Sequence, residues 1–199
     1  MDNDNNSQKN FGDENFIYAM GEQDEQPKPE INIADGYVIV GEEKIIFSRK
    51  FLLDKKFSII MPETFKLMSK AVADIKYPSI NRPDFIYTNE KSTVNFSFSH
   101  KPDEAPNEAI PEIKDVVEPL AMRMFPASSV IDSDAFEANG RNIAYYDFIA
   151  PALDDDIYTL TFMFSLEGRV VLGGCNCPAG DMDDWKPIFL QMLGSLEVK

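Results

Sequence analysis

Two cysteines spaced two positions apart are the residues best suited to chemistry. Cys175 and Cys177 are the only cysteines of the chain, and on a β-strand this spacing puts both thiols on the same side. Such thiols are soft ligands for zinc or copper, which need about two more ligands, and His100 is the only histidine available. We favour the plainer interpretation, in which both thiols are buried, as free cysteines commonly are. The sequence therefore predicts no metal site and no cofactor.

Two groups of aspartates supply hard oxygen ligands, and both fall in expected loops. Neither has the spacing of a calcium loop, in which aspartates alternate before a glycine and a distal glutamate follows. We interpret the first group as a solvated turn and the second as the start of a helix, where carboxylates complement the helix dipole. Both groups are also candidates for binding a cationic partner. They are Asp154, Asp155 and Asp156, then Asp181, Asp183 and Asp184.

The sequence carries no signature of catalysis. No Gly-x-Ser-x-Gly motif occurs, and a Cys and His pair would depend on His100 alone. Gly173-Gly174 lacks the Lys and the Ser or Thr of a phosphate loop, so we interpret it as a bulge or a close-packing site. We therefore expect a protein that is not an enzyme.

A polar, aromatic segment at 76–84 is a candidate for recognition. Tyr77 and Arg82 are residue types that often anchor protein interfaces, and Pro78 and Pro83 fix an extended course. The alternative is a rigid connector between two elements. We favour the connector, because most loops only connect.

The charge of the chain excludes several partners. It has 34 acidic and 19 basic residues in 199, a net charge of −15. Nucleic acid and anionic membrane surfaces repel such a protein, whereas basic proteins, cations and neutral ligands remain. No secretory signal and no stretch of about 18 apolar residues is present, so we expect no membrane span and a cytoplasmic location.

The first 35 residues differ from the rest. Residues 1–30 hold eight acidic and two basic residues, and they are rich in Asn and Gln. Such a segment cannot bury enough apolar surface to offset its ordering entropy. We predict a disordered tail at 1–35 and a single domain at 36–199. The apolar patch Phe16–Met20 is interpreted as a segment that docks on the domain or on a partner or is simply disordered, with a recognition motif as the alternative.

The periodicity of the domain predicts about nine strands and three helices. The helices are expected at 64–76, 107–124 and about 183–196, and the strands are joined mainly by short turns, which permit only antiparallel neighbours. A short strand is expected at 128–133. The strands at 143–150 and 157–165 carry apolar residues on both faces. We therefore predict an α+β fold, a central antiparallel sheet with helices on both faces in an α/β/α sandwich.

The order of elements and four short segments of this sequence resemble the PsbP-like superfamily. These are Phe57-Ser58-Ile59-Ile60-Met61-Pro62, the hairpin ending at Phe98, the Asn139-Gly140 turn into Tyr145-Tyr146, and the segment 189–196. The superfamily includes the photosystem II extrinsic protein, an import factor that binds the GTPase Ran, and DcrB-type bacterial proteins. The resemblance spans roughly residues 36 to 199 and implies the fold, with a binding or assembly role and no catalysis. It carries over no functional residue.

Together these features predict a non-enzymatic binding protein whose acidic surface engages a basic or cationic protein partner. The charge of the chain and the resemblance both favour this interpretation. The alternative is a domain that binds a small ligand or a metal through the region from Cys175 to Asp184.

Overall fold

The computed structural model describes residues 31–152 and 154–199. Residues Ile31–Lys199 form one compact unit. The acidic segment 1–30, with its apolar patch at 16–20, lies outside the described residues, so its disorder stays a prediction. Residues 31–35, which the sequence assigned to the tail, include the 3-10 helix η1 (Ile33–Asp35), and Ile33 is buried.

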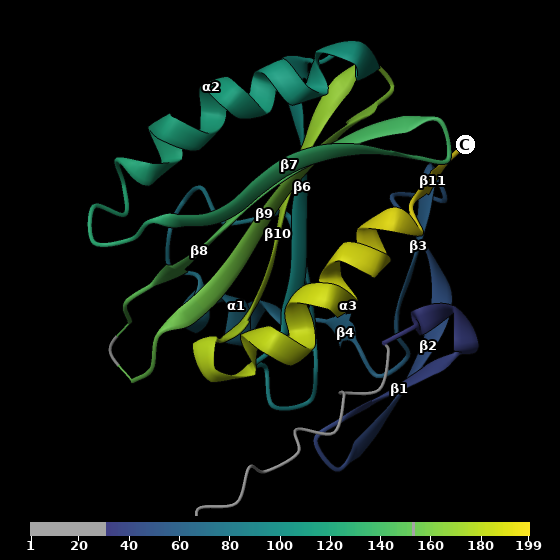
Figure 1. The fold of residues 1–199 in the computed structure, drawn as a ribbon, viewed down its shortest axis with the longest axis vertical. Helices are drawn as coiled ribbons and strands as arrows, with labels where there is room; N and C mark the ends of the chain where they lie inside the picture. The colour runs from purple at the N-terminus through teal and green to yellow at the C-terminus, as the bar shows by residue number, and fades with distance from the viewer. Residues whose placement is uncertain (1–30, 153) are drawn as a thin grey trace, which may run out of the picture. The chain divides into compact units, whose positions relative to one another are not determined.

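Eleven strands of the described chain form two antiparallel sheets (Figure 1). The seven-stranded sheet runs, in spatial order, β4 (Lys66–Leu67), β5 (Phe85–Thr88), β6 (Asn95–Glu104), β10 (Arg169–Pro178), β9 (Ile157–Leu166), β8 (Arg141–Ala150) and β7 (Val130–Ala138). The four-stranded sheet runs β1 (Tyr37–Val40), β2 (Glu43–Leu52), β3 (Phe57–Pro62) and β11 (Glu197–Val198). The α+β class and the antiparallel pairing are confirmed, whereas the separate four-stranded sheet was not predicted.

Three α-helices pack on these sheets. They are α1 (Lys70–Lys76), α2 (Ile110–Met122) and α3 (Met182–Gly194). The 3-10 helix η2 (Asn107–Ala109) leads into α2, and η3 (Ala179–Asp181) leads into α3. The predicted helix at 64–76 is wrong in its first half, because Lys66 and Leu67 pair with β5 as a strand. Ser69, and not Thr64, caps α1 by accepting a hydrogen bond from the Val72 amide.

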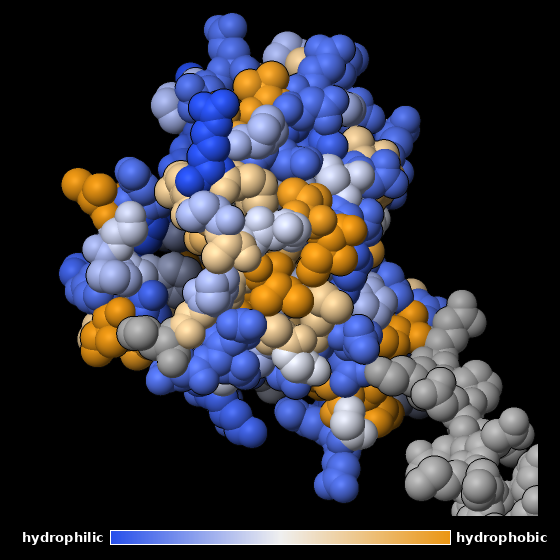
Figure 2. Space-filling model, turned by 60° about the vertical axis from the view of Figure 1, so that its left-hand side comes forward, coloured by the Kyte–Doolittle hydropathy of each residue, from blue (hydrophilic) through white to orange (hydrophobic). Residues whose placement is uncertain are grey.

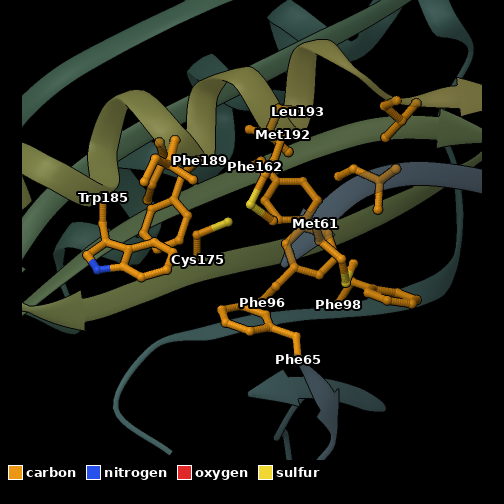
Figure 3. Close-up of a cluster of buried hydrophobic side chains, with 14 of the residues drawn as sticks. Met61, Phe65, Phe96, Phe98, Phe162, Cys175, Trp185, Phe189, Met192 and Leu193 are labelled. Carbon is orange, nitrogen blue, oxygen red and sulfur yellow. The ribbon is translucent and has the colours of Figure 1, made fainter. Parts of the chain in front are cut away.

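Side chains of the central strands alternate between two hydrophobic clusters. On β8, Ile143 and Tyr145 belong to a large cluster that also contains the buried side of α3 and residues of the four-stranded sheet. Their neighbours Ala144 and Tyr146 belong to a smaller cluster, which apolar residues of α2 complete. The large cluster is rich in aromatic rings, and Figure 3 shows those that lie beneath α3.

Gly173 makes room for a side chain of the neighbouring strand β9, with which it pairs. A Cβ atom at this position would lie 2.2 Å from Cζ of Phe162 and 2.6 Å from the Ser97 carbonyl oxygen. The Phe162 ring, which stacks on Phe96 at 5.3 Å between centroids, therefore occupies the space that a side chain would need. The sequence interpretation of Gly173 as a close-packing site is confirmed, and at Gly174 an added Cβ would meet only ordinary contacts.

We predict that Gly173→Ala destabilises the fold by about 1–3 kcal/mol, because the new methyl group overpacks the core against Phe162 and the backbone of β6. Gly174→Ala, one residue along the same strand, is the matched control and should cost clearly less, because its nearest neighbours would be 3.8 Å away or more. Urea unfolding midpoints of both variants measure the difference. Equal midpoints would contradict this account of Gly173.

Candidate functional site

The structure brings the two aspartate groups to the same end of the seven-stranded sheet. The first group lies in the connection from β8 to β9, and the second begins in η3 and continues into α3. The backbone amide of Ala179 donates to the carbonyl oxygen of Asp156 at 2.8 Å, which ties the two segments together. We call the exposed or half-exposed side chains gathered here the acidic end. They are Asp154, Asp155, Asp156, Asp181, Asp183 and Asp184.

The acidic end keeps most of its carboxylates exposed. Asp183 and Asp184 lie in the first turn of α3, where they complement the helix dipole as the sequence predicted. Asp181 precedes the helix and makes no capping hydrogen bond. Among the ion pairs of residues 31–152 and 154–199, none uses Asp154, Asp155, Asp156, Asp181 or Asp183.

Tyr77 and Arg82 contact different parts of the chain. The hydroxyl of Tyr77 lies 3.4 Å from the side-chain nitrogen of Asn176, so its ring packs beside the last residues of β10. The guanidinium of Arg82 binds Asp74 of α1 instead. That contact and a hydrogen bond from Lys70 lower the pKa of Asp74. Both side chains therefore fix the connector against its neighbours.

The cysteines face the core and not a ligand. Cys175 and Cys177 lie on the same side of β10, as predicted, and both are fully buried in the large cluster. Burial raises the pKa of both thiols, to about 12 for Cys177, so the thiol form persists at neutral pH. His100 pairs with Val171, four residues along β10 from Cys175, and its ring bonds the Leu166 carbonyl. In the described part of the chain, no group of three or more His, Cys, Asp or Glu could hold a metal ion.

The most unusual electrostatic feature of the described chain is a buried carboxylate, Asp147. Its side chain has no exposure to solvent. Its Oδ2 accepts hydrogen bonds from the Tyr158 hydroxyl and from Nζ of Lys186, both at 2.7 Å, whereas Oδ1 has no partner among the described residues. Lys186 also reaches Asp132 at 3.0 Å, and Asp132 accepts a hydrogen bond from Tyr145. These five residues form a polar network that links α3 to β7, β8 and β9.

The pKa shifts of this network favour the charge pattern that its geometry requires. Burial alone would lower the pKa of Lys186, but its bonds to Asp147 and Asp132 outweigh burial and raise it. The Lys186 contact lowers the pKa of Asp132. Burial and the neighbouring carboxylates raise the pKa of Tyr145 and Tyr158, so both phenols stay protonated as donors. These shifts therefore favour the charged forms of Asp132 and Lys186 and the neutral forms of the two phenols.

A shallow groove lies beside this network, between β7 and α3. It has a volume of about 390 Å³, and its lining combines the apolar side chains Phe136 and Leu190 with Tyr145, Asp134, Gln191 and Gly194. Sequence reasoning missed the network and the groove. The signal that was available is Asp147, a charged residue within the strongly apolar stretch 143–150, because such a charge is rarely buried without a partner.

Comparisons with known proteins identify the fold. No family model matches the sequence, and no curated protein matches it. The structure is similar to cyanobacterial PsbP (CyanoP) from Synechocystis sp. PCC 6803, with a TM-score of 0.57 and 13% identity, over 77% of this chain and 92% of that chain. It is also similar to LpqN of Mycobacterium tuberculosis, a protein involved in cell envelope biogenesis, with a TM-score of 0.50 and 10% identity, over 86% of this chain and 99% of that chain.

These likenesses define an α+β protein with a PsbP-like fold. The resemblance inferred from the sequence is therefore confirmed at the level of fold, and identities this low show nothing beyond the fold. No helix among the described residues has the length and apolar character needed to span a membrane.

We predict that Lys186→Met destabilises the protein by about 3 kcal/mol, because it leaves Asp147 as an uncompensated buried charge. Lys70→Met is the matched control. Lys70 also binds a carboxylate at 2.7 Å, but its side chain is 81% exposed, against 22% for Lys186. Loss of such an exposed pair should cost less than about 1 kcal/mol. If urea unfolding gave equal losses for the two variants, the network would not be a stabilising element.

We also predict that alkaline pH weakens the fold. The thiol pKa of Cys177 rises from an ordinary 9.0 to about 12 in the folded protein. Its stabilising contribution is therefore complete below pH 9 and is lost as the pH rises toward 12, by about 1.4 kcal/mol per pH unit. Urea unfolding between pH 8 and pH 11, with a reductant present, measures this slope. Cys177→Ala should remove that part of the slope, and an unchanged slope would argue against burial of the thiol.

Proposed function

We propose that this protein is a non-enzymatic binding protein whose acidic end engages a basic or cationic protein partner. The observation that carries the proposal is the hydrogen bond between Ala179 and Asp156, because it holds two separate aspartate groups at one end of the sheet. Carboxylates gathered in this way produce a local negative potential, which steers an oppositely charged partner during association.

Two further features support a surface of this kind. The ion pairs of the described chain leave the carboxylates of Asp154, Asp155 and Asp156 unused. The helices α2 and α3 pack on clusters that alternate along β8, and we infer that these helices cover opposite faces of the central sheet. Tyr77 contacts Asn176 near the end of β10, the strand that precedes the second aspartate group. We leave Arg82 out of the surface, because Asp74 already engages its guanidinium.

The alternative, a metal or small-ligand site from Cys175 to Asp184, receives less support. Both thiols point into the core with raised pKa, and a neutral buried thiol is a poor metal ligand. The cytoplasmic location stays a prediction.

We expect the triple variant Asp154→Asn, Asp155→Asn, Asp156→Asn to lose roughly tenfold in affinity for a basic partner, because rim charges set attraction and its salt dependence. The partner is first captured from lysate at low salt and then purified, and its binding is measured at low and high salt.

The matched control is the triple variant Glu42→Gln, Glu43→Gln, Asp54→Asn. It removes the same charge from exposed positions near the four-stranded sheet. A partner that binds both triple variants equally, or that ignores salt, would contradict a role for the acidic end.

A further inference from the structure

The strand β7 forms one edge of the seven-stranded sheet and pairs only with β8. In an edge strand every second residue directs its backbone N–H and C=O away from its neighbour. Ala135 is such a residue, because its amide donates to the carboxylate of Asp134 at 2.8 Å instead of to β8. The period of two then places the amides of Ser133 and Glu137 on the same outer side. No other described segment makes a backbone hydrogen bond to β7.

The charge along this edge is entirely acidic. The charged residues of β7 are Asp132, Asp134 and Glu137. Asp132 forms an ion pair with Lys186 of α3. Asp134 and Glu137 are both exposed, and no ion pair among the described residues uses either of them.

The two lysines that contact β7 from the helices are already occupied. Lys114 of α2 contacts Ser133 and pairs with Asp115 and Glu118, and Lys186 pairs with two carboxylates. These helix contacts hold β7 from both faces and leave its outer edge uncompensated in charge.

The groove between β7 and α3 adds apolar surface beside this edge. Phe136 of β7, Tyr145 of β8 and Leu190 of α3 line it. Figure 2 shows hydrophobic residues gathered in the middle of one side of the molecule, with hydrophilic residues around them. A strand added next to β7 would direct alternate side chains toward the α3 side, over this groove.

We propose that the outer edge of β7 binds an extended, basic segment of a partner protein, which adds to the sheet as an eighth strand. Backbone hydrogen bonds to Ser133, Ala135 and Glu137 provide affinity, as in other cases of strand addition. The amides of Ser133 and Ala135 exchange their present bonds to the carboxylates of Asp132 and Asp134 for bonds to the added strand. Specificity comes from basic side chains beside Asp134 and Glu137 and from an apolar side chain beside Phe136, over the groove.

The same charges disfavour a second copy of the chain as the occupant. Two β7 strands paired edge to edge would bring acidic side chains from both copies together, and like charges across a strand pair are destabilising. Strand addition at β7 is distinct from binding at the acidic end, because it depends on backbone pairing and on different residues.

A labelled synthetic peptide of about nine residues, in which threonine alternates with lysine and leucine, is the probe. Fluorescence anisotropy measures its affinity for the full chain. Asp134→Lys should weaken binding roughly tenfold by reversing the charge at the edge. Ala135→Pro should abolish binding by removing an outward amide, and an edge strand tolerates proline where the N–H faces solvent. Asp154→Lys, which makes the same charge reversal at the acidic end, is the matched control and should change affinity by less than about twofold.

Hydrogen exchange separates strand addition from simple charge attraction. Peptide binding should slow exchange at the amides of Ser133, Ala135 and Glu137, whereas exchange at the acidic end should stay unchanged. Thermal unfolding checks that both β7 variants are folded. If Ala135→Pro does not fold, the proposal is tested by Asp134→Lys and by the exchange pattern. Three results would overturn the proposal: equal binding of a peptide with glutamate in place of lysine, unchanged exchange along β7, or self-association of the chain that Ala135→Pro abolishes. Equal weakening by Asp154→Lys and Asp134→Lys would assign the peptide to the acidic end instead.

Discussion

A buried negative charge constrains the arrangement of this fold more than any other single group in the described chain. Removing a carboxylate from water costs several kcal/mol, and only close partners offset that cost. Asp147 obtains them from Tyr158 on β9 and from Lys186 on α3, both at 2.7 Å. Because Lys186 also holds Asp132 of the edge strand, one ammonium group fixes α3, β8 and β7 in a single geometry. The acidic end and the groove both lie next to elements that this contact positions.

Burial of apolar side chains provides the favourable free energy that offsets the cost of burying Asp147. The large cluster joins the seven-stranded sheet, the four-stranded sheet and α3, and Trp185, Phe189 and Met192 are among the residues that the helix contributes (Figure 3). The close approach of Phe162 over Gly173 belongs to the same cluster. Nonpolar burial is not directional, so it brings the layers together without setting their register. The hydrogen bonds of Asp147 are directional, and they select one position of α3 on the sheet.

Local patterns predicted the fold where one rule dominated and failed where two rules competed. Turns such as Asn139-Gly140 were correct, because both residues adopt positive φ there. The helix at 64–76 was extended too far, since Phe65 and Met68 fit a helical stripe yet are buried from an extended segment, while Ile75 on the same stripe is 80% exposed. The edge strand β7 was predicted too short, because acidic residues have low strand propensity although an edge accepts them. Asp147 marked the polar network in the sequence, but its partner Lys186 could not be predicted, because that lysine lies on α3, far along the chain.

The fold also changes the meaning of the net charge of −15. As a sum over the chain it predicted no binding to nucleic acid or anionic membranes, but it pointed to no surface. In the structure, carboxylates that the interior needs, such as Asp147, are matched by lysines. The ion pairs of the described residues do not use Asp134 and Glu137 of the β7 edge, nor Asp154, Asp155, Asp156, Asp181 and Asp183 of the acidic end. A charge that the fold compensates reflects a structural requirement, and a charge that it leaves uncompensated beside open backbone is available to a partner. This distinction makes β7 the more specific of the two acidic surfaces, because a basic segment there gains hydrogen bonds as well as attraction.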